Sequence, residues 1–151
     1  MKGHCALLLL SCLLLASCLK EHDIVREEKS RPPHDAALVE VLESICRALE
    51  DENSFGVFEL VAESYAPSRL ALKSSIDQDL ERYTGITIHL TPEHVEIMEN
   101  EDRGVVVAAW RLSRSAREDG EVQWRSGLSE FRFVRSAGKW LLEQQNGDPL
   151  F

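Results

Sequence analysis

Apolar residues recur at helical spacing between Leu38 and Leu49. The positions i, i+3, i+4, i+7 and i+11 are filled by Leu38, Val41, Leu42, Ile45 and Leu49. This stripe predicts an amphipathic helix with Asp35 as its N-cap. A second, shorter helix is expected to begin at the capping pair Asn53-Ser54 and to continue as far as Pro67. Ser68 predicts the cap of a third helix, which Gly85 terminates.

The apolar period changes to two residues after Gly85, as it does in half-buried strands. Apolar side chains alternate with polar ones through Ile86, Ile88 and Leu90. Thr91-Pro92 is expected to turn the chain into a short second strand that ends near Asn100. Long strands are predicted at 104–115, 121–135 and 139–145. Helices followed by about five strands predict an α+β fold, in which N-terminal helices pack on an antiparallel sheet.

The pair Asp119-Gly120 is the strongest hairpin signal in the chain. A two-residue loop there determines which residues lie opposite each other on the two flanking strands. The predicted pairs are Val106–Phe133, Ala108–Phe131, Trp110–Ser129 and Leu112–Gly127, and they make one face of the hairpin almost wholly apolar. A slip of one residue would place charged side chains opposite apolar ones. The core residues expected from this register are Trp110, Phe131, Phe133, Trp140 and Leu142.

The first residues predict export from the cytoplasm. Lys2 precedes an apolar run from Ala6 to Leu15, about ten residues long, whereas a membrane-spanning helix needs about twenty. Leu15-Ala16-Ser17-Cys18 resembles the bacterial lipobox, in which the Cys takes lipid and becomes the first residue. The resemblance implies a lipoprotein signal peptide at 1–17, lipidation of Cys18 and stable anchoring by several acyl chains. Leu19 follows Cys18, which favours the periplasmic face of the outer membrane.

Residues 18–34 are expected to be a lipidated Cys and a flexible tether, because the stretch is charged and ends at Arg31-Pro32-Pro33. Residues 35–151 then form one domain. Cys46 is the one cysteine left after the signal peptide and Cys18, so we expect no disulfide and a buried thiol. The formal net charge of −9 argues against nucleic acid as a partner and against attachment to anionic lipid through a basic patch.

The chain from about residue 35 onward resembles the nuclear transport factor 2-like superfamily, which includes ketosteroid isomerases and related polyketide cyclases. The residues that carry the resemblance are Glu130-Phe131-Arg132-Phe133-Val134, Gly138-Lys139-Trp140-Leu141-Leu142 and Gly147-Asp148-Pro149-Leu150-Phe151. It covers about 35–151 and implies a bent antiparallel sheet wrapped around a helix, with an open conical pocket. The superfamily includes enzymes, binding modules and assembly adaptors, so the resemblance implies the fold more than the activity.

The chemistry of the expected pocket is neutral. The candidate lining residues are Tyr65, Trp110, Ser129, Phe131, Gln144 and Asn146. The inward positions of the sheet hold no carboxylate, whereas a ketosteroid isomerase needs a carboxylate base. A bulge in the turn at Ser136–Gly138 is the open alternative, because it would exchange Gln144 for Glu143 and supply that base. His89 and His94 do not have a standard zinc spacing, and we expect no metal, no cofactor and no catalytic residue.

Three functions are compatible with these patterns. The first is a membrane-tethered periplasmic lipoprotein whose cone binds a small apolar ligand or an envelope protein partner without catalysis. The second is an isomerase, dehydratase or cyclase of the same fold. The third is an envelope assembly factor. An inward-facing Asp, Glu or His would favour the second.

Overall fold

The computed structural model describes residues 33–98 and 102–151. The expected signal peptide, Cys18 and almost all of the tether lie outside the described residues, as does the expected strand end at Asn100. Within the described part, no helix combines the length and the apolar character that crossing a membrane requires.

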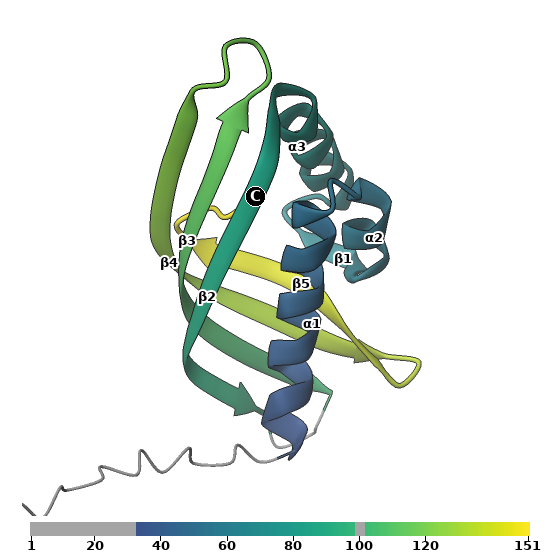
Figure 1. Ribbon diagram of the computed structural model, residues 1–151. Helices are drawn as coiled ribbons and strands as arrows, with labels where there is room; N and C mark the ends of the chain where they lie inside the picture. The colour runs from purple at the N-terminus through teal and green to yellow at the C-terminus, as the bar shows by residue number, and fades with distance from the viewer. Residues whose placement is uncertain (1–32, 99–101) are drawn as a thin grey trace, which may run out of the picture. The chain divides into compact units, whose positions relative to one another are not determined.

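The elements form one sheet with helices on its concave side (Figure 1). The helices are α1 (Pro33–Glu50), α2 (Ser54–Glu59) and α3 (Arg69–Arg82). The strands are β1 (Val61–Ala66), β2 (Tyr83–Ile97), β3 (Arg103–Ala116), β4 (Val122–Ser136) and β5 (Lys139–Gly147). They lie in the order β1-β5-β4-β3-β2, and every neighbouring pair is antiparallel except β1 and β5, which are parallel. The predicted α+β class is confirmed, with a mixed sheet of five strands.

The three helices begin near their predicted caps. The Asn53 side chain accepts a hydrogen bond from the Gly56 N–H at 2.9 Å, and Ser68 Oγ accepts one from the Ala71 N–H at 3.2 Å. The start of α1 differs, because the helix begins at Pro33 and Asp35 lies in its first turn, where a carboxylate favours the positive end of the helix dipole. The third helix ends at Arg82, before Gly85.

The segment expected to continue the second helix is instead strand β1. Its apolar residues, Val61, Ala62 and Tyr65, are buried, and their spacing fits one face of a helix as well as a short strand. Tertiary pairing decides between the two, because β5 has an edge whose backbone groups need partners. β1 supplies them, with Val61 opposite Leu142, while the Leu142 N–H donates to the Leu60 carbonyl at 2.8 Å.

The predicted turn at Thr91-Pro92 is wrong, because β2 runs through both residues as one strand. Pro92 lies opposite Ala108, and the register shifts between Pro92 and His94. An edge strand tolerates proline because one side of its backbone has no ladder to supply, and a register shift accommodates the local distortion. β2 is such an edge strand.

The β3–β4 hairpin has a four-residue loop, Arg117–Gly120, in place of the expected two-residue loop. The Ala116 N–H donates to the Glu121 carbonyl, and Gly120 has a positive φ of 75°. The strand partners therefore shift by two residues, and the observed pairs are Val106–Phe131, Ala108–Ser129, Trp110–Gly127 and Leu112–Arg125. A shift of two preserves the side on which each residue lies. The predicted pairs are wrong, whereas the predicted faces are confirmed.

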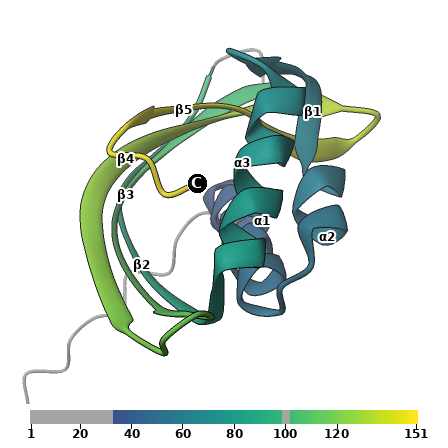
Figure 2. The same cartoon turned by 90° about the horizontal axis from the view of Figure 1, so that it is seen from above.

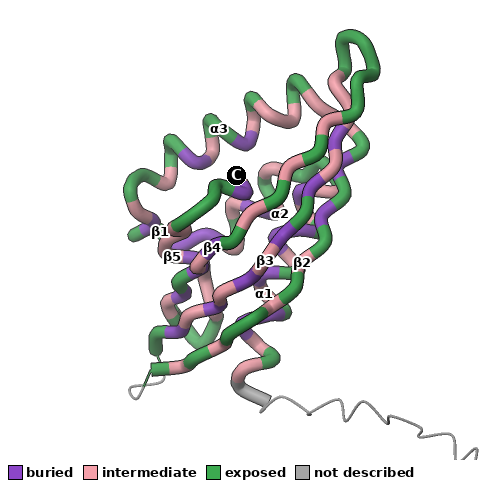
Figure 3. The backbone as a smooth tube through the Cα atoms, turned by 90° about the vertical axis from the view of Figure 1, so that its left-hand side faces the viewer, coloured by how far each residue is buried: buried purple, intermediate pink, exposed green. Residues whose placement is uncertain are grey.

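The core lies between the concave face of the sheet and α1, which the sheet curves around (Figure 2). Burial alternates along the strands, as the tube in Figure 3 shows for β3 and β4. The expected core residues Trp110, Phe131, Phe133 and Leu142 are buried. Trp140 is half-buried instead, with the Arg135 guanidinium 5.8 Å from its ring centre. Cys46 is buried as expected, and its burial raises the thiol pKa to about 12.

Candidate functional site

The interior of the cone is apolar and almost full. Five apolar side chains line it from the helices and the sheet: Leu49, Ile76, Leu80, Ile86 and Leu112. Two residues of the segment after β5, Leu150 and Phe151, lie against the same space. The void that remains measures about 20 Å³, which leaves room for little more than one water molecule. The place where the resemblance implied an open pocket is therefore occupied by the chain itself.

We call Leu150 and Phe151 the plug, because they fill the cone from its open end. Figure 2 shows the end of the chain lying inside the curve of the sheet, opposite α3 and α1. Leu150 is 2% exposed. The Phe151 ring meets the Phe131 ring edge to face, with ring centres 6.4 Å apart. This arrangement is favourable for aromatic pairs, so the plug is held by packing of apolar groups.

The two residues before the plug, Asp148 and Pro149, form a hydrogen-bonded latch against β4 and β5. The Asp148 carbonyl accepts from Ser129 Oγ at 2.5 Å and from Gln145 Nε2 at 3.0 Å. The Asp148 carboxylate accepts from the Leu128 N–H at 3.0 Å, and the Pro149 carbonyl accepts from Arg125 Nη2 at 2.7 Å. Gly147 starts the latch with a positive φ of 90°.

Ser129 connects the latch to the core. Its hydroxyl donates to the latch and accepts a hydrogen bond from Trp110 Nε1 at 2.8 Å. Both side chains are buried, so the pair satisfies two polar groups that would otherwise be costly to bury. Of the other candidate residues, Phe131 contacts the plug, and Tyr65 belongs to the buried core, where burial raises the pKa of its hydroxyl.

Gln144 and Asn146 do not face inward, because β5 contains a bulge. Leu142 lies opposite Phe133, but Gln144 lies opposite Arg132, so the alternation shifts by one residue. Gln144 Nε2 donates to Asn146 Oδ1 at 3.0 Å, and Asn146 Nδ2 donates to Glu130 Oε1 at 3.1 Å on the outer face. The inward position falls to Gln145, opposite Phe131.

Glu143 is the unpaired residue of this bulge. A bulge in the turn at 136–138 was the open alternative; the structure has its bulge within β5 instead, and this bulge does not bring Glu143 into the cone. The Glu143 carboxylate instead accepts a hydrogen bond from Ser64 Oγ at 3.3 Å and lies 3.6 Å from Arg103 Nη2. These contacts hold the Glu143 carboxylate away from the cone, so they exclude Glu143 as the inward base of the open alternative.

An ion pair at the mouth of the cone was missed by the sequence analysis. Arg114 Nη1 donates to Asp79 Oδ2 at 2.7 Å, and the guanidinium lies 3.6 Å from the centre of the Tyr83 ring. Only 10% of the Arg114 side chain is exposed, against 34% for Asp79. Arg114 Nε is buried without a hydrogen-bond partner in the described part of the chain. Strand alternation could have found Arg114, because it shares the inward parity of Trp110 and Leu112.

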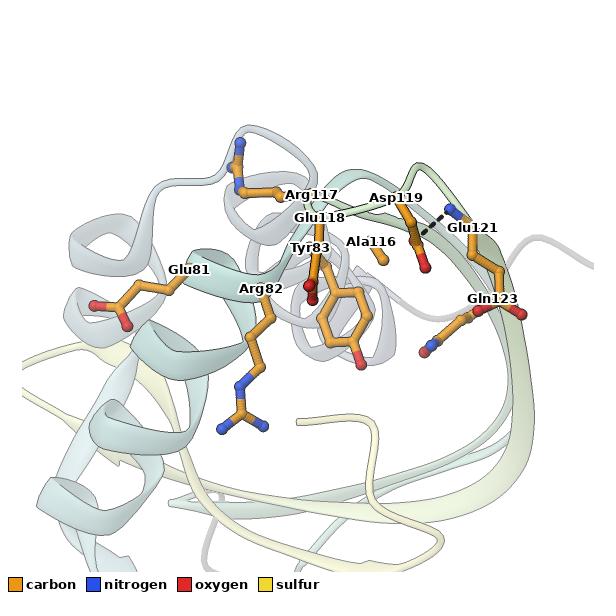
Figure 4. Close-up of a pocket in the computed structure, with 9 residues that line it drawn as sticks. All are labelled: Glu81, Arg82, Tyr83, Ala116, Arg117, Glu118, Asp119, Glu121 and Gln123. Carbon is orange, nitrogen blue, oxygen red and sulfur yellow. Dashed lines mark hydrogen bonds between the residues drawn. The ribbon is translucent and has the colours of Figure 1, made fainter.

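A polar cleft of about 530 Å³ lies outside the mouth, between the end of α3 and the β3–β4 hairpin (Figure 4). It is lined by Glu81, Arg82, Tyr83, Ala116, Arg117, Glu118, Asp119, Glu121 and Gln123. The Glu52 carboxylate accepts hydrogen bonds from the Thr84 hydroxyl and from the Arg117 guanidinium at this end of the domain, and these bonds, the one from Thr84 first, lower the pKa of Glu52. Within residues 33–98 and 102–151, no cluster of three or more His, Cys, Asp or Glu is placed to hold a metal.

The fold is shared with solved structures of low sequence identity. A conserved protein from Planctomyces limnophilus is 18% identical, with a TM-score of 0.66 over 73% of this chain and 91% of that one. A ketosteroid isomerase-like protein from Erwinia carotovora atroseptica is 14% identical, with a TM-score of 0.64 over 75% and 93%. A nuclear transport factor 2-like superfamily protein from Salmonella enterica serovar Typhimurium is 11% identical, with a TM-score of 0.64 over 76% and 89%.

No protein-family model matches the sequence, and no curated protein matches it. At these identities the structural similarity establishes the fold. The domain has the cone-shaped nuclear transport factor 2-like fold that the sequence resemblance implied.

Proposed function

We propose that the chain is a lipid-anchored lipoprotein of the bacterial envelope whose cone binds a small, mainly apolar ligand without transforming it. The observation that carries the proposal is the composition of the cone interior, where apolar side chains from α1, α3, β2 and β3 surround a space filled by only two residues. A concave apolar site with a few polar groups at one end is the usual form of a small-molecule site. The polar end here is the pair Asp79–Arg114.

The cone contains an inward-facing carboxylate, Asp79, which is the kind of residue that would favour the enzyme alternative. Proteins of this fold include one that resembles ketosteroid isomerase, and such chemistry needs a free base next to the substrate. Among the described residues that line the cone, Asp79 is the one carboxylate, and it is hydrogen-bonded to Arg114. The Asp79 Oδ2 atom already accepts a charge-assisted hydrogen bond, so this carboxylate is not a free group directed at a substrate. The pair therefore favours a role in binding over one in proton transfer.

Charge placed inside the cone should weaken ligand binding. Leu80 lines the cone, whereas Leu70 lies on the same helix with 75% of its surface exposed. We expect Leu80→Glu to weaken binding of prodan, a neutral naphthalene ketone dye, by about tenfold or more, because the carboxylate would lose its hydration when the dye enters. The measurement is a fluorescence titration of the purified chain. Leu70→Glu is the matched control and should leave the affinity unchanged. Equal affinities in the two variants would place the dye outside the cone.

Loss of the Cys18 thiol should release the protein from the membrane. Cys18→Ser removes the nucleophile that takes the lipid, so we expect no fatty-acid labelling and recovery of the protein in the soluble periplasmic fraction. Cys12→Ser is the control and should leave labelling intact, since the apolar run before Cys12 is too short for a lipobox. Fractionation of wild-type cells should place the protein in the outer membrane. Labelling that survives in Cys18→Ser would contradict the anchor.

An envelope protein partner is the second candidate, and a surface patch favours it. The outer face of β4 exposes Val122, Trp124 and Leu128, with 74% of Trp124 accessible. A shallow depression of about 570 Å³, lined in part by His89, Arg111 and Ser126, lies on the same face. Exposed tryptophan is a common anchor of protein interfaces. If a partner docks here, Trp124→Ala should lose its capture from envelope extracts, while Leu70→Ala, away from the patch, should retain it.

A further inference from the structure

We propose that the plug is exchangeable, so that Leu150 and Phe151 leave the cone when a ligand enters. We further propose that the ligand is a neutral, mainly apolar molecule with one oxygen acceptor that binds Arg114 Nε–H. Both statements rest on the proposed ligand-binding function. They add how access of the ligand to the cone is controlled and which chemical class of ligand binds there. Four features of the cone support them.

The first feature is the division of the segment after β5 into a latch and a plug. The side-chain hydrogen bonds that hold this segment end on Asp148 and Pro149. In the described structure, neither Leu150 nor Phe151 takes part in a side-chain hydrogen bond or an ion pair. The plug can therefore swing out by rotation of the backbone beyond Pro149, while the latch and its contacts stay in place. Leu150 and Phe151 are held in the cone by apolar packing, and a ligand would have to replace that packing.

The second feature is that the walls of the cone do not depend on the plug. Ile76 and Leu80 belong to α3, whose N-terminus is capped by Ser68. Leu112 belongs to β3, which is paired on both sides by β2 and β4. Elements fixed by hydrogen-bonded ladders keep their positions when a neighbouring side chain leaves, so the vacated space would persist as a cavity.

The third feature is the aromatic surface that the plug covers. Phe131 is 0% exposed and packs against Phe151 in a T-shaped arrangement. Departure of the plug would leave this ring without its aromatic partner. A ligand with an aromatic ring or a similar flat apolar group would restore this contact, because such a group has the size and shape of the Phe151 side chain that it replaces.

The fourth feature is the Nε–H of Arg114, a buried donor without a partner at the mouth of this space. Such a donor is unfavourable until an acceptor reaches it. The charge of the guanidinium is already balanced by Asp79 at 2.7 Å. An anionic ligand would meet the Asp79 carboxylate, and a cationic ligand would meet the guanidinium. A neutral carbonyl, ester or ether oxygen satisfies the donor without either conflict.

The experiment compares prodan, which carries a ketone, with N-phenyl-1-naphthylamine, an apolar dye without an oxygen acceptor. Both are titrated against the full chain carrying Cys18→Ser, with and without the additional changes Leu150→Ala and Phe151→Ala. If the plugged state holds about nine-tenths of the molecules, opening the cone tightens both dyes about tenfold. Leu70→Ala, a truncation of an exposed side chain of α3, is the matched control and should change neither affinity.

Two further readouts separate the parts of the proposal. Prodan should accelerate cleavage by thermolysin, an endoprotease that cuts before Leu and Phe, at Leu150 and Phe151 of the wild-type tail, followed by mass spectrometry, because the displaced plug becomes accessible. Arg114→Lys keeps the charge opposite Asp79 but loses the Nε–H, so it should weaken prodan several-fold and leave N-phenyl-1-naphthylamine unchanged. Equal loss of both dyes in this variant would overturn the acceptor requirement.

The outcomes distinguish failure of the plug from failure of the proposed function. Tight prodan binding that Leu80→Glu weakens about tenfold or more, with no gain from the tail variants and no change in thermolysin digestion, would overturn the exchangeable plug and keep the binding site. Absence of binding in every variant, with circular dichroism showing a folded tail variant, would overturn both. A gain in affinity accompanied by faster digestion supports both.

Discussion

Phe131→Ala should destabilise the domain by about 3–5 kcal/mol, which is comparable to the whole free energy of unfolding of many small domains. Phe131 is 0% exposed, lies opposite Val106 and touches the plug through Phe151. Its removal leaves a cavity that the paired strands β3 and β5 cannot close by moving. Urea unfolding followed by circular dichroism measures the change.

Trp124→Ala is the control for this experiment, because it also truncates an aromatic residue of β4 but on the exposed face. Its free energy of unfolding should change by less than about 1 kcal/mol. A midpoint for Phe131→Ala close to that of wild type would show that the inward face of β4 has been misassigned.

Gly147→Ala should destabilise the domain by about 2–4 kcal/mol, because two effects coincide at this residue. Gly147 has a φ of 90°, and an added Cβ would lie 2.6 Å from the Leu128 carbonyl oxygen. That overlap is with the backbone of β4 and cannot be relieved by rotation of a side chain. Thermal unfolding measures the loss, and the Asp148 hydrogen bonds should weaken with it.

Gly85→Ala separates the two effects. Gly85 also has a positive φ, of 60°, but an added Cβ would meet no atom within 4 Å. We expect a loss of about 1 kcal/mol there, from backbone strain alone. Equal losses at the two glycines would contradict the steric contribution assigned to Leu128.

Strand parity was predictable from the sequence, but strand pairing was not. The residues Val106, Trp110, Phe131 and Phe133 face inward as expected, because apolar alternation decides the face. Their partners depend on the length of the hairpin loop, which is four residues because Gly120 adopts a positive φ at its end. The identity of the turn residues did not reveal that length.

Long-range pairing accounts for the other differences. Val61–Ala66 pairs with β5, a strand about eighty residues later, and no local pattern signals that partner. The bulge at Glu143 reverses the alternation that placed Gln144 and Asn146 inward. The chain end filling the cone depends on the same tertiary arrangement, because Leu150 and Phe151 follow the bulged strand. Asp79 and Arg114, by contrast, lie on predicted elements and could have been found by extending each apolar face by one turn or one pair.

Pro92 and the register shift that follows it in β2 have a consequence for how copies of the domain behave beside one another. β2 ends the sheet, and an open strand edge invites the same strand of a neighbour to add to it. Pro92 withholds an N–H, the register shift after it breaks the straight run of backbone groups, and Glu93 and Glu96 add like charges. A lipid anchor of the kind proposed would confine many copies to a surface, where such additions become frequent. With such an anchor, this edge would reduce aggregation between copies confined to the same membrane surface.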